Sequence, residues 1–409
     1  MINQKLPEID MIRIISILIV VVLIHIPLSY AYCFYVDLNQ FGVFLVNNVG
    51  IYVAMGSFAF VSGFGLYLNP NNRNLNSSRK ILAFLKKRFI RIFPLYWVAI
   101  ILFLFFVGYL DIDPLYLLYH FLGLQIIVAP YFGPPMLTLW FIGIIVIYYL
   151  IYLVINLRES IKWIIPASIV ILFFFIFLNG IFGLVEIRFF LYYLLFIFGM
   201  ITALIYTSPE YARVKERLSK MRPAVSLLIP LLTTILGFIA FTLLTQFVYF
   251  FFILEYGSSN FHFILELHPD FFQLASAILL INLIIASFII FVFSLFKVIF
   301  RGFGFIDSKR KIELVVSVTA YSTYSVYLFH RIFLTIFTAI MTFGLNINML
   351  AAQNLYIVLV FVPFIFLFSY LIQKAYDRLW KLVSNRFRDK ESSTNSSPDI
   401  NEAQPSSMT

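Results

Sequence analysis

The chain has 409 residues, of which 62% are hydrophobic and only 12% are charged, whereas soluble domains carry roughly 25% charged residues. This composition excludes an ordinary soluble enzyme, and repeated apolar runs of about 18 residues or more predict a polytopic helical membrane protein. A single Cys excludes an intrachain disulfide framework and a multi-Cys metal site, and we expect no metal. The net charge of +10 does not indicate nucleic-acid binding, because the distribution of the charges has another explanation.

Ten apolar segments predict ten membrane-spanning helices, and therefore an all-α membrane helix bundle. They are residues 11–32, 43–68, 89–109, 135–156, 163–183, 187–206, 224–254, 271–299, 314–342 and 355–382. A cytoplasmic N-terminus puts all 29 Lys and Arg residues on the cytoplasmic side except Arg188 and Arg331. This asymmetry follows the positive-inside rule, and an even number of spans returns the C-terminus to the cytoplasm. We expect a multi-pass protein of the cell membrane.

Two segments stand apart from these spans. The stretch DPLYLLYHFLGLQIIVAPYFGPP, residues 113–135, holds about 16 apolar residues and has both ends outside, which predicts one short re-entrant or interfacial segment. Residues 386–409 are polar and rich in Ser, which predicts a disordered cytoplasmic tail after a membrane domain of residues 1–385. The chain has no room for a soluble catalytic domain, so any chemistry takes place among the helices.

The first predicted span rises from a cationic residue to a histidine. At 1.5 Å per residue, His25 lies about 18 Å above Arg13, in the outer half of a hydrocarbon core about 30 Å thick. His330 enters the ninth span from the same side and reaches a similar depth. Ionisable groups within a span cost on the order of several kcal/mol and are site candidates. The alternative is that each imidazole is a hydrogen-bonded structural group or an interfacial one.

A cluster of cations precedes the third span. Arg88 and Arg91 are three residues apart and share a helix face, directly after Lys86 and Lys87. Paired guanidinium groups bind phosphate in a forked geometry, which favours a phosphate site at the cytoplasmic mouth of the bundle. The alternative is that these cations only anchor the helix on the cytoplasmic side.

In chain order, several motifs resemble those of the acyltransferase-3 family of integral-membrane acyltransferases. The opening IDMIRIISILIVVVLIH resembles the start of the family, and the SGF of residues 62–64 follows. KKRFIRIFPLYW carries the family's Arg-x-x-Arg as Arg88 and Arg91. LWFIGIIVIYYL, FFLYYLLFIFGM and YSTYSVYLFH resemble later helices. The resemblance extends over residues 6–382.

One spacing departs from the family, which places its Arg and His eleven residues apart, whereas Arg13 and His25 are twelve apart. The extra residue turns His25 about 120° away from Arg13, instead of about 20°. Arg13 therefore shares a face with His25 only if the helix is overwound or bulged between them. Asp10 lies three residues before Arg13, so these two residues are expected to form a structural pair.

The resemblance implies a membrane acyltransferase that moves an acyl group, most commonly acetyl, from cytoplasmic acyl-CoA to a hydroxyl of a cell-surface glycan or related acceptor. It implies that Arg88, Arg91, Lys86 and Lys87 hold the acyl-CoA, which is the donor substrate. His25 is expected to act as general base, because an imidazole with a pKa near about 6.5 suits neutral pH.

Arg13 and His330 complete the candidate catalytic set, with His330 polarising the carbonyl or orienting the acceptor. Glu186 and Arg188, at an outer helix end, either contact a sugar or form a local salt bridge, and the salt bridge is favoured. Two other functions remain open. A transporter or flippase for a lipid-linked or anionic solute would use the same basic mouth and intramembrane histidines, and a membrane glycosyltransferase would need a carboxylate pair that no loop offers.

Overall fold

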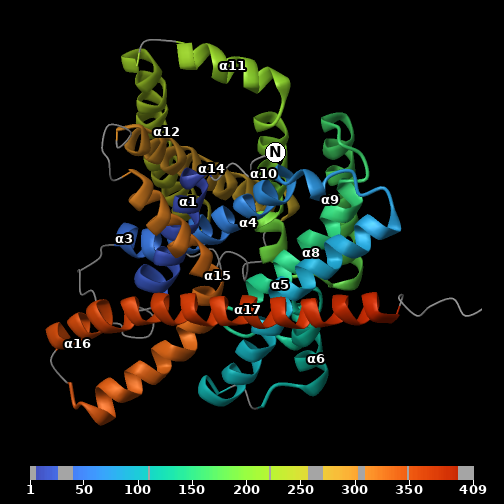
Figure 1. The fold of residues 1–409 in the computed structure, drawn as a ribbon. Coiled ribbons are helices and arrows are strands. Elements are labelled where there is room, and N and C mark those ends of the chain that lie inside the picture. The colour runs from blue at the N-terminus through green and yellow to red at the C-terminus, as the bar shows by residue number, and fades with distance from the viewer. Residues whose placement is uncertain are drawn as a thin grey trace, which may run out of the picture.

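The computed structural model describes residues 6–25, 40–108, 111–220, 223–256, 270–302, 309–347 and 350–394, and these residues form helices and no strands (Figure 1). Eight of the described helices are long and apolar enough to cross a membrane. In chain order they are α4 (Gly50–Leu68), α5 (Ser78–Phe106), α9 (Ile161–Phe182), α10 (Ile187–Tyr206), α12 (Pro223–Tyr256), α14 (Phe271–Gly302), α15 (Lys309–Ala339) and α17 (Val362–Thr394). The predicted all-α membrane bundle is confirmed.

The two other predicted spans also coincide with helices. The first is α1 (Pro7–Leu18), which continues as a π-helix, η1 (Ile19–His25), while residues 26–32 lie outside the described part of the chain. The fourth is α8 (Trp140–Ile155), a shorter apolar helix of 16 residues. Short helical segments extend the long helices: α3 (Gln40–Phe44) and η2 (Leu45–Val49) precede α4, η5 (Ile340–Gly344) follows α15, and α16 (Leu350–Tyr356) and η6 (Ile357–Phe361) precede α17.

The predicted re-entrant or interfacial segment consists of two short helices, α6 (Pro114–Leu122) and α7 (Gln125–Phe132). Asp113 caps α6 by accepting hydrogen bonds from the N–H groups of Leu115 and Tyr116. Gly123 ends α6 in the left-handed region at φ 70°, a conformation that glycine adopts without a steric penalty. Neither helix is long enough to cross a bilayer, as expected of a re-entrant or interfacial segment.

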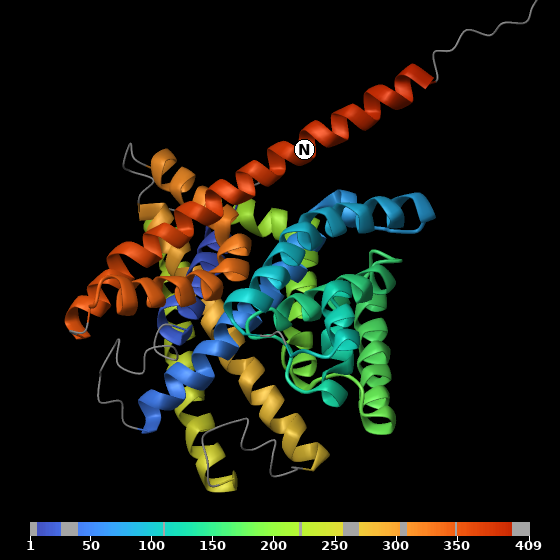
Figure 2. The same ribbon diagram turned by 90° about the horizontal axis from the view of Figure 1, so that it is seen from below.

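Two of the loops between these helices contain further helices. The 3-10 helix η3 (Pro70–Asn72) follows α4, and α11 (Pro209–Lys220) joins α10 to α12 (Figure 1). Helix α17 extends well beyond the bundle at its C-terminal end (Figure 2). It remains helical to Thr394, and residues 395–409 of the predicted tail lie outside the described residues.

The first helix lies inside the bundle. It packs against α4, α14 and α15, and its apolar residues Ile12, Ile17 and Val21 are fully buried. A helix that is surrounded by protein on several sides can carry polar side chains that would be too costly against lipid. The position of α1 therefore allows both Arg13 and His25 to face other helices.

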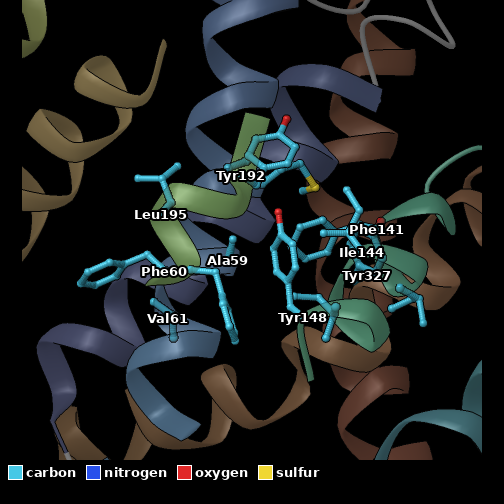
Figure 3. Packing of buried hydrophobic residues seen from close by; sticks show 14 of the residues in the cluster. Ala59, Phe60, Val61, Phe141, Ile144, Tyr148, Tyr192, Leu195 and Tyr327 are labelled. Carbon is cyan, nitrogen blue, oxygen red and sulfur yellow. The ribbon is translucent and has the colours of Figure 1, made fainter. Parts of the chain in front are cut away.

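Two glycines bring α4 and α10 into direct backbone contact. A Cβ on Gly63 would lie 2.1 Å from the carbonyl oxygen of Phe196, and a Cβ on Gly199 would lie 2.1 Å from that of Phe60. Small residues allow membrane helices to pack this closely. Around the crossing, aromatic side chains of α8, α10 and α15 fill the core, as Figure 3 shows for Tyr148, Tyr192 and Tyr327.

Helix α5 runs through Pro94 without interruption. Proline has no N–H, so the carbonyl of Ile90, four residues earlier, has no helical donor. The hydroxyl of Tyr376 on α17 donates to this carbonyl over 2.5 Å, and the hydroxyl of Tyr324 on α15 donates to the carbonyl of Ile92 over 2.7 Å. Neighbouring helices thus satisfy the backbone that the proline frees, as membrane helices require, and this fixes α5, α15 and α17 together.

Candidate active site

The two histidines of the predicted site are in contact, although 305 residues separate them in sequence. Nε2 of His330 lies 2.7 Å from Nδ1 of His25, and the two rings are stacked with centroids 4.8 Å apart. His330 is fully buried and His25 is half-buried. The ring of His25 therefore faces the bundle interior, and the structure brings together these two predicted residues.

The backbone around His330 determines which nitrogen carries each proton. Nδ1 of His330 lies 3.0 Å from the carbonyl oxygen of Val326 and 2.9 Å from that of Tyr327, so it carries the hydrogen and donates. In a neutral ring Nε2 is then an acceptor, and it accepts from Nδ1–H of His25. This arrangement leaves Nε2 of His25 unprotonated, with no partner among the described residues.

A π-helical segment lies between Arg13 and His25. Residues Ile19–His25 form η1, in which hydrogen bonds run from residue i to i+5 and one extra residue is accommodated per turn. This bulge absorbs the additional residue of the twelve-residue spacing and restores the phase of an eleven-residue one. The condition under which the two residues share a face is met, because the helix is bulged.

Arg13, Arg88 and Arg91 line one cavity of about 220 Å³, which we call the arginine cavity. Arg13 comes from α1 and the other two come from α5. The other lining residues come from α4, α5, α8 and α15. They are Phe58, Val61, Ser62, Gly65, Leu66, Ile92, Phe141, Ile142, Ile145, Tyr149, Ala320, Tyr321, Thr323, Tyr324 and Tyr327. Arg13 thus lies with the predicted phosphate-binding arginines.

The guanidinium groups of the arginine cavity are only partly neutralised. Arg13 pairs with Asp10 at 3.1 Å, as predicted. Arg88 is buried and lies over the rings of Phe84 and Tyr149, at 5.2 and 5.6 Å from their centroids. Among the described residues, neither Arg88 nor Arg91 forms an ion pair. Several like charges around a small cavity create a positive potential that favours an anion.

Tyr327 lies between the arginine cavity and the histidine pair. It lines the cavity, and its ring centroid is 6.3 Å from that of His330, one helical turn further along α15. Its hydroxyl donates to the carbonyl of Thr138, a β-branched residue held at φ 63°. A side chain in this region costs about 1–3 kcal/mol, so the surrounding structure determines the conformation of Thr138 and positions the start of α8.

The two predicted lysines differ in position. Lys87 lines a second cavity of about 660 Å³ between α5 and α17, which we call the α17 cavity. Its other lining residues are Ile90, Arg91, Gln373, Tyr376, Asp377, Trp380, Lys381 and Asn385. Lys86 is exposed and lines neither cavity. Arg91 is shared by both cavities.

The sequence analysis did not single out the tyrosines of α15. Tyr321, Tyr324, Tyr327 and His330 follow one another at intervals of three residues, so each is a neighbour of the next on the helix surface and the row winds gradually around α15. All three tyrosines line the arginine cavity. This regular spacing was visible in the sequence, and it continues directly to the buried histidine.

At the start of α10, Glu186 and Arg188 form the predicted local salt bridge, with Nε 2.5 Å from Oε1. The guanidinium group of Arg188 also lies 4.6 Å from the ring centroid of Trp140. A third histidine, His120 in α6, is buried, with Nδ1 2.9 Å from the carbonyl of Tyr116 and Nε2 accepting from the N–H of Met136. Burial lowers the pKa of His120 to about 4, so the ring is neutral and connects two backbone segments.

The fold, the arginine cavity and the contact between His25 and His330 define a multi-pass helical membrane protein with a basic cavity next to a buried histidine pair. The chain belongs to the acyltransferase-3 family, because the family model described as an acyltransferase domain matches residues 6–374. The protein is therefore a membrane acyltransferase. Searches of curated proteins and of solved structures found no significant match.

Proposed function

We propose that the protein transfers an acyl group, most commonly acetyl, from cytoplasmic acyl-CoA to a hydroxyl of a cell-surface glycan or related acceptor in the cell membrane. The observation that supports this most is the unprotonated Nε2 of His25, held by His330 next to the wall of the arginine cavity. A base and an anion site this close together suit transfer from an anionic donor.

In the proposed reaction, Nε2 of His25 takes the proton of the acceptor hydroxyl while the hydroxyl oxygen attacks the thioester carbonyl carbon. The tetrahedral intermediate collapses with cleavage of the C–S bond, and the thiolate receives the proton from His25. The products are an ester and free coenzyme A thiol. His330 accepts a hydrogen bond from Nδ1–H of His25 throughout and orients the ring. No serine or cysteine nucleophile is needed for this direct transfer.

The donor would be held from the cytoplasmic side. Arg88 and Arg91 would bind phosphate groups by charge-assisted hydrogen bonds, and Arg13 from α1 adds a third guanidinium to the same cavity. Arg13 is then a donor-binding residue and not a partner of His25 in the chemistry. The pantetheine arm would pass along Tyr327, whose ring lies on the way to the histidine pair.

Release of free thiol tests the reaction. Purified protein in liposomes, supplied with labelled acetyl-CoA and an extract of envelope glycans, is expected to release thiol and to transfer the label to base-labile esters. Mass spectrometry of surface glycans from cells with and without the protein then identifies the acceptor. Vesicle uptake or loss of a solute without thiol release would contradict acyl transfer and favour transport.

A further inference from the structure

The arginine cavity alone is too small for a whole coenzyme. Its volume of about 220 Å³ lies below the roughly 300–1,000 Å³ of typical small-molecule sites. The α17 cavity, at about 660 Å³, lies within this range. Because Arg91 lines both cavities, a long ligand held at Arg91 has space on either side of it.

Hydrogen bonds between α15 and α17 also link the walls of the two cavities. The hydroxyl of Tyr321, which lines the arginine cavity, donates to Oδ2 of Asp377, which lines the α17 cavity. The side chain of Gln373 donates to Oδ1 of Asp377 over 3.3 Å and accepts from Ser325 of α15 over 2.8 Å. These bonds hold the wall between the cavities in one geometry.

The charges of the α17 cavity favour an anion. Three cations line it, Lys87, Arg91 and Lys381, against one carboxylate, Asp377. The carboxylate already accepts two hydrogen bonds from protein groups, and its remaining lone pairs suit an amino donor such as the exocyclic amine of a purine. A ligand that carries both phosphate and an amino-substituted base matches this set.

Trp380 supplies a surface for a planar ring. It is 37% exposed, lines the cavity, and has no ring or cation partner among the described residues, in contrast to the stacked aromatic residues of the core. An aromatic ring with no protein partner can stack on a nucleic-acid base, because every base has a π-face.

We propose that the α17 cavity binds the adenosine 3′-phosphate end of the acyl-CoA donor, an inference that rests on the proposed function. Adenine stacks on Trp380, Lys381 and Lys87 contact the 3′-phosphate, and Arg91 holds the pyrophosphate where the two cavities meet. The pantetheine arm then enters the arginine cavity. The C-terminal helix thereby selects a nucleotide-bearing donor.

Binding of adenosine 3′,5′-bisphosphate tests the site without any acyl transfer. We expect calorimetric titration of the full-length protein in phosphatidylcholine nanodiscs to show binding. Trp380→Ala should weaken it about tenfold, the change expected when a base loses an aromatic stacking partner. Trp380→Phe should retain most of the affinity. Arg378→Gln is the matched control, because Arg378 is an exposed cation of the same helix that does not line the cavity.

Failure to bind, or equal affinity in the parent protein and Trp380→Ala, would overturn the nucleotide site. The same titration in nanodiscs that contain phosphatidylglycerol separates a nucleotide from a lipid headgroup. We expect unchanged affinity there. If the anionic lipid abolishes binding of the bisphosphate, the cavity is a headgroup site and the proposal is overturned.

Donor truncation connects the site to turnover. Trp380→Ala should raise KM for acetyl-CoA about tenfold and leave KM for S-acetylpantetheine, which has no nucleotide, unchanged. Lys381→Gln should remove the preference for acetyl-CoA over its 3′-dephospho form. If the parent protein releases thiol but both variants behave like it, the nucleotide site fails while acyl transfer stands. If bisphosphate binding depends on Trp380 and no thiol is released, the reverse holds.

Discussion

The histidine pair and the arginine cavity differ in how many of their polar groups have a partner. At the pair, the backbone and the second ring occupy three of the four ring nitrogens, and only Nε2 of His25 remains. In the cavity, Arg88 is buried against aromatic rings with no carboxylate partner, and Arg91 also has no ion pair among the described residues. One region prepares a single atom, whereas the other retains several unneutralised charges.

This difference separates a chemical role from a binding role. A buried charge without a partner is costly, and a bound anion offsets that cost, so the cavity gains most when a ligand is present. The hydrogen-bonding groups of the two neutral histidine rings are already paired without a ligand, so in the proposed reaction the pair stabilises the transition state and not the bound donor. We therefore expect changes at the pair to act on kcat and changes in the cavity to act on KM.

The largest effect is expected from His25→Ala, which removes the proposed base. Turnover should fall by about 10²–10⁴-fold, the usual contribution of general base catalysis, while the affinity for acetyl-CoA stays the same. Thiol release and calorimetric donor binding measure the two quantities separately. Leu23→Ala is the control, because Leu23 lies two residues earlier and is exposed. A His25→Ala protein with near-normal kcat would remove the base.

Arg88→Gln and Arg91→Gln each remove one positive charge from the arginine cavity. Each should raise KM for acetyl-CoA by about 10–100-fold, because a charged hydrogen bond contributes roughly 1.5–3 kcal/mol, with little change in kcat. The loss at the exposed Arg91 should depend more on salt than the loss at the buried Arg88. Arg79→Gln, an exposed cation of the same helix outside both cavities, serves as the control. Unchanged donor affinity in both variants would leave membrane anchoring as their role.

Two substitutions of His330 test whether it acts through its hydrogen bond to His25. His330→Phe removes the acceptor for Nδ1–H of His25 and should lower kcat about tenfold, roughly the worth of one hydrogen bond. His330→Gln keeps an acceptor near the position of Nε2 and should recover most of the activity. Steady-state kinetics at several pH values measure both. Equal kcat in the two variants would mean that His330 does not position His25 through this bond.

The smallest effect is expected from Tyr376→Phe, which leaves the Ile90 carbonyl beside Pro94 without its donor. Stability should fall by about 1 kcal/mol, seen as a lower melting temperature in detergent. Tyr370→Phe is the control, because the hydroxyl of Tyr370 accepts a hydrogen bond from Nζ of Lys374 in the same helix and hydrogen-bonds to no carbonyl of α5 in the described part of the chain. If both variants melt alike, the hydroxyl of Tyr376 does not hold α17 against α5.

Much of this fold could be predicted from the sequence, because apolar length and cation placement are local properties of the chain. The predicted depth of His25 and His330 rests on the same local properties and stays a prediction. Their contact could not be predicted, since it joins helices 305 residues apart and depends on how α1 packs inside the bundle. The π-helical turn of η1 was foreseen only as a condition, because a bulge depends on neighbouring helices as much as on sequence.

Other parts of the candidate site depended on tertiary structure. Arg13 was expected to share a face with His25 only if the helix between them is overwound or bulged, and the structure places it in the arginine cavity with two residues of α5. Whether this position serves donor binding stays a prediction. Trp380 and Lys381 were not among the predicted site residues, because only the packing of α17 across α5 brings them to Arg91.

The close contacts of Gly63 with Phe196 and of Gly199 with Phe60 limit where the protein can open. Two backbones in direct contact cannot slide past each other or separate without losing these contacts. We therefore expect α4 and α10 to move together as one rigid unit. The helices around α5 are joined instead by tyrosine hydroxyls, which can exchange one acceptor for another at little cost. We therefore expect the proposed acyl-CoA donor to enter and leave on the side of α5, while α4 and α10 keep their contact.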